Sequence, residues 1–487
     1  MIFNSVTYIL FLLITVALYW ALPSRSRLWL VLFSSTLFYG FWRPEFLLVM
    51  LLSATTDFFC AKRIEDSDSL RTRRAWLGIS LGVNLGMLFY FKYLFFFTDN
   101  AVAFINLFGC KTSAPAFSII LPLGISFYTF ETISYIVDVY RRFIKAERNF
   151  VMYAGFVTFF PKLIAGPVLR ASEMLPQFET GAIFRLEIFV SGLQRILLGL
   201  FLKVVLADNI SPLVDDGFAQ NPTALSALDV MTLAFLFGFQ IYFDFAAYSS
   251  IAIGSARLMG IHVPENFDFP YMARSPREFW KRWHISLSSW IRDYLYLPLL
   301  GVQVHDRAAG GVPIDVAEKG RQSRYPIIAL YLTWAIMGFW HGANWTFVVW
   351  GLLHASFITI HRVAIRFTPA LPDVLRDWGG WLLTLLAVML AWIPFRAQNV
   401  ETALALFSRL LSPREYLWLG MRENTYLVTA LIFVIFCMAY MVQDRAISVL
   451  RRHLAASFLV ETVIFAIVFA MVFVFLRPIS QFIYFQF

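Results

Sequence analysis

The stretch from Gly338 to Trp345, GFWHGANW, places a histidine, His341, between two apolar segments. The first segment, 326–340, covers about 22 Å as a helix, less than the roughly 30 Å hydrocarbon layer of a bilayer. His341 is therefore expected below the membrane surface. An imidazole titrates near pH ~6.5, so it can take a proton from a hydroxyl group. The residues alone support equally a general base in a cavity and a histidine in an interfacial aromatic belt.

A second candidate site lies between Arg274 and Gly301. Taken as one helix, the segment has a polar stripe at i, i+4, i+7 and i+11 with two indoles alongside, namely Arg277, Lys281, His284 and Ser288, with Trp280 and Trp283. This face could hold a phosphate-bearing acyl carrier or supply a second catalytic histidine. A basic amphipathic helix resting on anionic headgroups explains the same pattern, and the residues alone slightly favour it.

Two acidic residues, Glu131 and Asp244, lie inside apolar segments. Ionisable groups at membrane depth are costly, so each is a candidate for orienting a histidine or carrying protons. Pairing with a buried basic residue is the more common explanation, and Lys162, Arg195 and Lys203 are the candidate partners.

The stretch 480–487, SQFIYFQF, alternates aromatic residues around a single tyrosine, Tyr484. A tyrosine can act as a nucleophile once a base is close, so Tyr484 is a candidate acyl carrier. The residues alone favour an interfacial aromatic anchor instead. The sequence contains no serine nucleophile elbow, phosphate-binding loop or metal-ligand spacing, and no metal site is predicted.

The elements that must position these residues are membrane helices. The chain has 487 residues, of which 59% are apolar and 15% charged, against about 25% charged in soluble proteins. Apolar runs of about 20 residues recur, enough to cross a hydrocarbon layer. The net charge of +9 comes from basic residues in short loops. This is typical of cytoplasmic loops and makes nucleic-acid binding a poor interpretation.

The predicted helical segments lie at 2–22, 28–59, 75–97, 116–139, 151–169, 186–207, 228–256, 326–340, 343–361, 378–395, 426–444 and 458–476. Pro44 interrupts 28–59, where a re-entrant hairpin is expected because proline breaks the helical hydrogen-bond ladder. Pro161 and Pro167 break 151–169 in the same way. Such breaks are tolerated at membrane depth only where protein or a water-filled cavity covers the backbone. The sequence therefore predicts an internal cavity.

Basic loops give an orientation. Loops at 23–27, 60–74, 140–149, 301–325, 362–377 and 445–457 are rich in Lys and Arg and are placed in the cytoplasm. The N-terminus and the tail after 476 are then expected outside. Segment 2–22 has no basic region before it and no small-residue cleavage site after it, so a retained first span is expected instead of a signal peptide.

Taken together, these segments resemble the membrane-bound O-acyltransferase (MBOAT) family, and within it the bacterial branch that O-acetylates alginate, peptidoglycan and cellulose. The resemblance runs over nearly the whole chain. Its blocks are PLGISFYTF at 122–130, FPKLIAGP at 160–167, GLFLKVVLAD at 199–208, DFAAYS at 244–249, EFWKRWHISLS at 278–288, RDYLY at 292–296 and GFWHG at 338–342. The resemblance implies an all-α polytopic fold, with about 11–13 membrane helices plus re-entrant or interfacial helices around a central tunnel. Residues 1–487 would form one transmembrane domain, with an extracytoplasmic tail at 477–487.

The resemblance also implies roles for the candidate residues. In this family a membrane-embedded histidine deprotonates an acceptor hydroxyl for attack on an acyl thioester, and His341 matches it. His284 matches the second histidine of this branch, which assists or binds, and FIYF at 482–485 resembles an acyl-shuttling tail motif that contains Tyr484. Substrate contacts are expected from Arg277, Trp280, Lys281, Trp283, Ser288, Trp340, Asn344 and Asp244.

The implied reaction moves an acetyl group from acetyl-CoA in the cytoplasm, with no bound cofactor, across the bacterial inner membrane. A periplasmic acyltransferase partner protein would pass it to a polysaccharide, with alginate, cellulose and peptidoglycan left open. One alternative is a transporter or flippase with His341 and Asp244 as a proton relay. Transporters often contain internal repeats, and the sequence has none. A second alternative is transfer of a D-alanyl-type group from a carrier protein.

Overall fold

The computed structural model describes residues 1, 3–113, 119–164, 166–302, 326–367, 372–452, 454–476 and 482, and side chains outside 444–459. Over this part of the chain every regular element is a helix, which confirms the all-α prediction. Six helices are long and apolar enough to cross a membrane, as expected of a multi-pass membrane protein. The count of 11–13 membrane helices and the central tunnel stay predictions.

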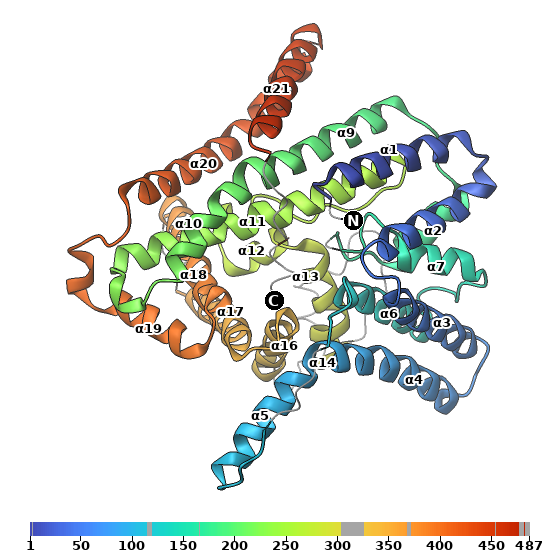
Figure 1. Cartoon of the computed structure of the whole chain (residues 1–487), viewed down its shortest axis with the longest axis horizontal. Helices are drawn as coiled ribbons and strands as arrows, with labels where there is room; N and C mark the ends of the chain where they lie inside the picture. The colour runs from blue at the N-terminus through green and yellow to red at the C-terminus, as the bar shows by residue number, and fades with distance from the viewer. Residues whose placement is uncertain are drawn as a thin grey trace. The chain divides into compact units, whose positions relative to one another are not determined.

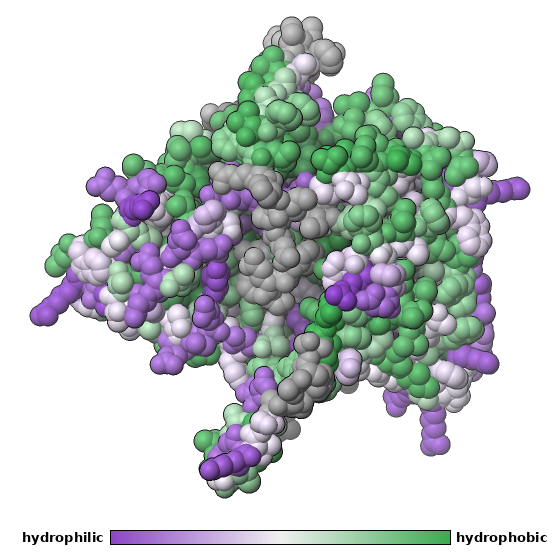
Figure 2. Space-filling model, viewed as in Figure 1, coloured by the Kyte–Doolittle hydropathy of each residue, from purple (hydrophilic) through white to green (hydrophobic). Residues whose placement is uncertain are grey.

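The six candidate spans are Leu70–Leu107, Leu186–Phe218, Ala227–Leu258, Trp345–Ala364, Asp373–Arg396 and Glu423–Gln443. Shorter apolar helices lie at Val6–Ala21, Pro326–His341 and Val460–Val474. Figure 2 shows hydrophobic side chains over much of one face. Large apolar residues such as Ile14, Leu383 and Leu427 are 60–70% exposed, as helices that face acyl chains require.

The chain forms two compact units, and the first contains residues 1–193, 252–264 and 289–324. Its elements, with η marking 3₁₀- and π-helices, are α1 (Val6–Ala21), α2 (Ser24–Gly40), α3 (Phe46–Glu65), α4 (Leu70–Leu88), η1 (Phe89–Tyr93), α5 (Leu94–Leu107), α6 (Ile125–Tyr140), α7 (Phe150–Thr158), α8 (Ala171–Thr180), most of α9 (Leu186–Leu200), the end of α11 (Ala227–Leu258), η5 (Arg292–Tyr296) and α14 (Leu297–Leu299). Helix α3 packs against α4, α6 and α7, and α2 packs against α7.

The predicted helix breaks are present in the first unit. Helix α2 ends at Gly40 and α3 begins at Phe46, so Pro44 lies in the interruption. Helix α7 ends at Thr158, before Pro161. The irregular stretch that follows packs on the turn before α6, where Gly124 has φ +71° and a Cβ would lie 2.1 Å from the Leu163 carbonyl oxygen. Only glycine fits this turn.

A buried ion pair holds the irregular stretch in place. The Lys162 ammonium binds the Glu131 carboxylate, and both side chains are almost fully buried. Glu131 also accepts a hydrogen bond from the Leu169 backbone N–H at 3.0 Å. The predicted pairing of Glu131 with a basic residue is thereby confirmed. Because one carboxylate contacts two points of the stretch, it fixes backbone that has no helix of its own.

The second unit contains residues 194–251, 265–288 and 325–487. Its elements are the end of α9, η2 (Phe201–Ala207), α10 (Asp208–Phe218), η3 (Pro222–Ala224), most of α11, η4 (Pro270–Met272), α12 (Pro276–Arg282), the start of α13 (Ile285–Ile291), α16 (Pro326–His341), α17 (Trp345–Ala364), α18 (Asp373–Arg396), α19 (Val400–Leu411), η7 (Pro413–Tyr416), α20 (Glu423–Arg452) and α21 (Leu454–Val474). Helix α17 packs between α16 and α18 (Figure 1), and α12 packs on α17 and α18.

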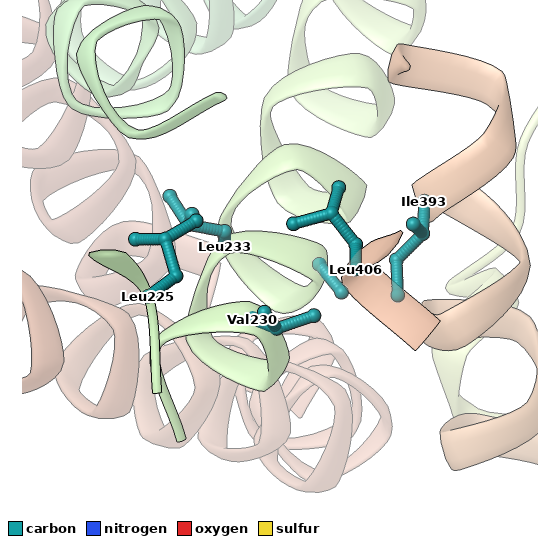
Figure 3. Packing of buried hydrophobic residues seen from close by; sticks show 6 residues of the cluster. Leu225, Val230, Leu233, Ile393 and Leu406 are labelled. Carbon is teal, nitrogen blue, oxygen red and sulfur yellow. The ribbon is translucent and has the colours of Figure 1, made fainter. Parts of the chain in front are cut away.

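One apolar cluster in the second unit joins the start of α11 to α18 and α19. Figure 3 shows Leu225, Val230 and Leu233 near Ile393 and Leu406. These residues are at most 3% exposed, so the cluster holds the helices together by close van der Waals packing, which drives helix association in membranes. This packing ties α18 to α11, and α18 in turn supports α17.

Candidate active site

The tight hairpin of α16 and α17 positions His341. His341 is the last residue of α16, and Asn344 caps α17 by accepting a hydrogen bond from the Thr346 backbone N–H at 3.1 Å. The two helices approach very closely, because a Cβ on Gly351 would lie 2.1 Å from the Trp334 carbonyl oxygen. Glycine at this point lets the backbones touch, and the contact sets where α16 delivers His341.

Aromatic rings enclose the imidazole of His341. Its ring centroid lies 4.9 Å from the rings of Trp340 and Trp350 and 5.3 Å from the ring of Phe395. The residue is 4% exposed. This burial favours an internal position over a place in an exposed aromatic belt. Charges that develop in such a dry environment interact more strongly with nearby dipoles than they would in water.

A further histidine, His354, joins this cluster from α17. It is fully buried, and its ring lies 4.8 Å from the ring of Trp350. The Trp280 indole N–H donates to Nδ1 of His354 at 3.3 Å. The sequence-based prediction did not include His354, although a histidine inside the apolar segment 343–361 is the kind of costly residue that singled out His341.

The segment 274–301 does not form the single helix that was expected. α12 and α13 are separate short helices, and His284 lies between them with φ +43°. A non-glycine residue in the left-handed region cannot continue a right-handed helix. The predicted stripe is therefore wrong, because it divides at His284: Arg277 and Lys281 lie on α12, and Ser288 lies on α13.

His284 is held in a fully buried pocket. Phe245 packs edge-on to its ring at 4.6 Å and Phe267 lies at 6.3 Å. Its Nδ1 lies 3.1 Å from Oδ1 of Asn266, which also accepts from the Ser286 hydroxyl at 2.8 Å. Since an amide oxygen only accepts, Nδ1 of His284 carries the proton in this arrangement. Burial lowers the pKa of His284 well below its usual range, so the ring is neutral at physiological pH.

Indole rings connect the two predicted histidine regions within the second unit. Trp283, next to His284, packs against Trp392 at 5.0 Å. Trp392 stacks on Trp350 at 6.0 Å, and Trp350 contacts His341. The structure therefore brings Trp283, Trp340 and His341 into one aromatic cluster. Trp280 joins the same cluster through Trp350, at 5.8 Å.

The other predicted substrate contacts differ in their surroundings. Lys281 is exposed and Arg277 is half-buried. The Ser288 hydroxyl donates to the Trp283 carbonyl at 3.0 Å, and the Asn344 amide donates to the Gln398 carbonyl at 2.9 Å. Ser288 and Asn344 thus both donate to backbone carbonyls of this chain. A role for any of these four residues in binding substrate stays a prediction.

Asp244 forms part of a buried charge cluster. The Lys203 ammonium lies 2.7 Å from the Asp244 carboxylate and 2.8 Å from that of Asp208. Lys203 belongs to η2, a π-helical turn, and such turns occur frequently at functional sites. The predicted pairing of Asp244 with a basic residue is confirmed. Arg195, the other candidate, pairs with Glu265 instead.

Within residues 477–487 the structure describes Phe482. Phe482 is fully buried, with its ring 4.2 Å from Tyr248 and 5.7 Å from Phe245. Phe245 is the residue that packs edge-on to His284. Phe482 is therefore anchored on the wall of the His284 pocket. Tyr484 lies outside the described residues.

Comparison with known sequences identifies the family. A profile of the MBOAT, membrane-bound O-acyltransferase family, matches residues 142–310, which include His284. The chain is 38% identical over 445 residues to the probable alginate O-acetylase AlgI of Azotobacter vinelandii, covering 91% of this chain and 84% of that protein. The chain belongs to the membrane-bound O-acyltransferase family.

Two further relatives match different shares of this chain. The peptidoglycan O-acetyltransferase of Helicobacter pylori is 36% identical over 409 residues, covering 78% of this chain and 73% of that protein. The teichoic acid D-alanyltransferase of Streptococcus thermophilus is 30% identical over 251 residues, covering 50% of this chain and 57% of that protein. The chain is thus similar to acetyltransferases over far more of its length.

Membership of the MBOAT family decides between the function classes. An MBOAT protein is an O-acyltransferase, so the chain is an enzyme, and the transporter or flippase alternative is set aside. The apolar helices make it a multi-pass membrane enzyme.

Proposed function

We propose that this MBOAT enzyme transfers an acetyl group from acetyl-CoA in the cytoplasm to a cell-surface polysaccharide, with His341 as the general base. The relatives that cover most of the chain are named for O-acetylation of alginate and of peptidoglycan. The observation that carries the assignment of the base is the enclosure of His341 by Trp340, Trp350 and Phe395. In this proposal the enzyme lies in the bacterial inner membrane, where it can reach both cytoplasmic acetyl-CoA and the cell surface.

The transfer needs one base that becomes an acid. His341 takes the proton of the attacking hydroxyl as its oxygen bonds to the thioester carbonyl carbon. The tetrahedral intermediate collapses, the carbon–sulfur bond breaks, and the imidazolium returns the proton to the departing thiolate. The products are an ester and a free thiol. General acid–base catalysis of this kind contributes about 10²–10⁴-fold, and the surrounding rings keep out the water that would hydrolyse the thioester.

His284 takes a different role in this proposal. Its Nδ1 proton is directed at Asn266, and in that tautomer Nε2 carries a lone pair, which accepts a hydrogen bond and does not donate one. An acceptor cannot stabilise an oxyanion, and the single proton of the attacking hydroxyl is assigned to His341. His284 is therefore assigned to binding another donor group of the acceptor, and its fixed ring restricts the angle from which the acceptor approaches.

Tyr484 is the proposed first acceptor of the acetyl group. The supporting observation is that Phe482, two residues earlier, is buried against Phe245 beside His284. In the first transfer the Tyr484 hydroxyl attacks the thioester, which gives a tyrosyl ester and free CoA. In the second, a glycan hydroxyl attacks that ester and releases the tyrosine. A periplasmic partner protein would catalyse this second step outside the membrane.

Polysaccharide O-acetylation in cells tests the proposal. A strain that lacks the protein is complemented with His341→Ala, Tyr484→Phe or His262→Ala, and acetyl esters on the isolated glycan are counted by mass spectrometry. His262 is an exposed histidine and serves as the matched control. Among these three variants, we expect acetyl esters on the glycan only with His262→Ala. Acetylation at the wild-type level with His341→Ala would exclude it as the base, and the same result with Tyr484→Phe would exclude the relay.

The donor is tested separately. The D-alanyltransferase of Streptococcus thermophilus is similar to half of this chain, so a D-alanyl carrier protein is the appropriate competitor. Purified protein in liposomes is given either radiolabelled acetyl-CoA or a radiolabelled D-alanyl carrier protein. The proposal predicts release of CoA and labelling of the protein with the first donor only. If only the carrier protein labelled the enzyme, the donor would be the D-alanyl carrier protein and not acetyl-CoA. The role of His341 would still be decided by the His341 variant.

A further inference from the structure

A cavity of about 730 Å³ lies in the second unit, between α20 and the stretch formed by the end of α9 with η2. Six apolar residues make its two long walls: Leu198, Leu202 and Leu206 on one side, and Ile432, Ile435 and Phe436 on the other. Its volume falls within the roughly 300–1,000 Å³ of small-molecule sites. The rings that enclose His341 do not line it, so this cavity is distinct from the proposed catalytic cluster.

The cavity opens toward the lipid side of these helices. Both walls come from segments long and apolar enough to cross a membrane. Leu198 is 40% exposed and Ile435 is 55% exposed, and both line the cavity. On the same helix as Ile435, Leu431 and Met438 are more than half exposed. Exposed apolar side chains on a membrane helix face the acyl chains of the bilayer. A bilayer lipid can therefore reach the opening of the cavity.

Charged side chains of both signs line the cavity. Arg195 and Glu265 line it and pair with one another, and they are 26% and 46% exposed. Asp268 lines it as well and lies 3.3 Å from Arg282. Among the described residues, the lining thus carries one cation and two carboxylates, and Arg282, outside the lining, is shared between Asp268 and Glu278. A headgroup that carries both a phosphate and an ammonium matches this arrangement, whereas one with a phosphate alone meets uncompensated carboxylates.

We propose that this cavity binds one zwitterionic phospholipid, a phosphatidylethanolamine, from the surrounding bilayer. An acyl chain lies between the leucines of α9–η2 and the isoleucines of α20. The phosphate binds Arg195, and the ammonium binds Glu265 and Asp268. The lipid takes no part in the chemical steps of the acetyl transfer proposed above, and its binding is measured without acetyl-CoA.

The proposed lipid would also lie close to Asn266, the residue that contacts His284. The inner wall of the cavity includes Asn266 and Ser249, and the Asn266 amide donates to the Ser249 hydroxyl at 3.0 Å. Asn266 is the residue whose carbonyl oxygen faces His284. A lipid chain in the cavity therefore fills the space behind the residue that orients His284, where water would otherwise compete for the Asn266 amide.

Lipid titration by native mass spectrometry tests the proposal. Purified, delipidated full-length protein is titrated with phosphatidylethanolamine and with phosphatidylglycerol. We expect one tightly bound phosphatidylethanolamine for each chain, with an affinity at least about tenfold above that for phosphatidylglycerol. Glu265→Gln should reduce this preference because Glu265 contacts the ammonium, whereas Arg195→Gln should lower the affinity for both lipids. Equal affinities of the wild type for the two lipids would overturn the headgroup assignment.

Two neighbouring tryptophan substitutions locate the site. Ala439 lines the cavity, whereas Met438, the preceding residue, is 54% exposed and does not line it. Ala439→Trp places an indole inside the cavity, and we expect this variant to lose at least about tenfold in affinity for phosphatidylethanolamine. Met438→Trp should bind as the wild type does. Size-exclusion chromatography confirms that both variants are monodisperse. The proposal would be overturned if the wild type and both variants bound phosphatidylethanolamine equally. It would also be overturned if both variants lost affinity to the same extent.

Discussion

His341 and His354 pack edge-on against the same indole, that of Trp350, with ring centroids 4.9 and 4.8 Å away. Trp350 and His354 are four residues apart on α17, so they share one face of that helix. His341 reaches the indole from the end of α16. The orientation of the proposed base therefore depends on a ring that a second histidine supports.

Replacing His354 by phenylalanine keeps a ring beside Trp350 but removes the nitrogen that accepts from the Trp280 N–H. An unsatisfied buried donor costs about 1–3 kcal/mol. We therefore expect His354→Phe to lower the free energy of unfolding by about that amount, measured by denaturant unfolding of the purified protein. Exposed His262→Phe should unfold as the wild type does. Wild-type stability in His354→Phe would show that the hydrogen bond contributes nothing.

The close contact of α16 with α17 gives a second prediction. Gly351→Ala forces a methyl group against the Trp334 carbonyl, and overpacking of this kind costs about 1–3 kcal/mol. Because the helices must separate, His341 moves, and acetyl transfer should fall together with stability. Gly379→Ala on α18 is the control, since nothing lies within 4 Å of its added Cβ. Equal transfer rates in the two variants would mean that the spacing of the helices does not position His341.

The Glu131–Lys162 pair gives a third prediction. Lys162→Met leaves a buried carboxylate without its cation, which costs about 3–5 kcal/mol. The double variant Lys162→Met/Glu131→Gln removes both charges and keeps an acceptor for the Leu169 N–H, so it should recover most of the loss. Thermal unfolding in detergent measures both variants. A double variant as unstable as the single one would argue that packing, and not the unpaired charge, is responsible.

Several helices could be predicted closely from the sequence, although α8 and α19 lie outside the predicted segments. The apolar segment 228–256 corresponds to Ala227–Leu258, and 326–340 corresponds to Pro326–His341. Apolar runs encode membrane helices strongly because every backbone group in a bilayer must be bonded internally. The proline breaks at Pro44 and Pro161 were predictable for the same reason.

The local geometry of the candidate site was harder to predict. Periodicity assumes a continuous helix, and nothing in the residues around His284 announces its left-handed backbone, which the Asn266 contacts help to hold. His354 lies outside the family blocks, although a histidine inside an apolar segment is costly at membrane depth and is therefore a candidate by its position alone. That Glu131 and Asp244 would each pair with a basic residue could be predicted, since a buried charge needs a partner. Which lysine serves which carboxylate depends on tertiary packing.

The role of His341 as the general base is tested most directly by the rate of CoA release from acetyl-CoA, with purified wild-type protein and His341→Gln compared in the same liposomes. Glutamine keeps a polar side chain of similar size but cannot take up a proton at working pH. We predict that the rate falls by about 10²–10⁴-fold, while thermal unfolding is unchanged. A folded His341→Gln protein that releases CoA within about twofold of the wild-type rate would contradict the assignment.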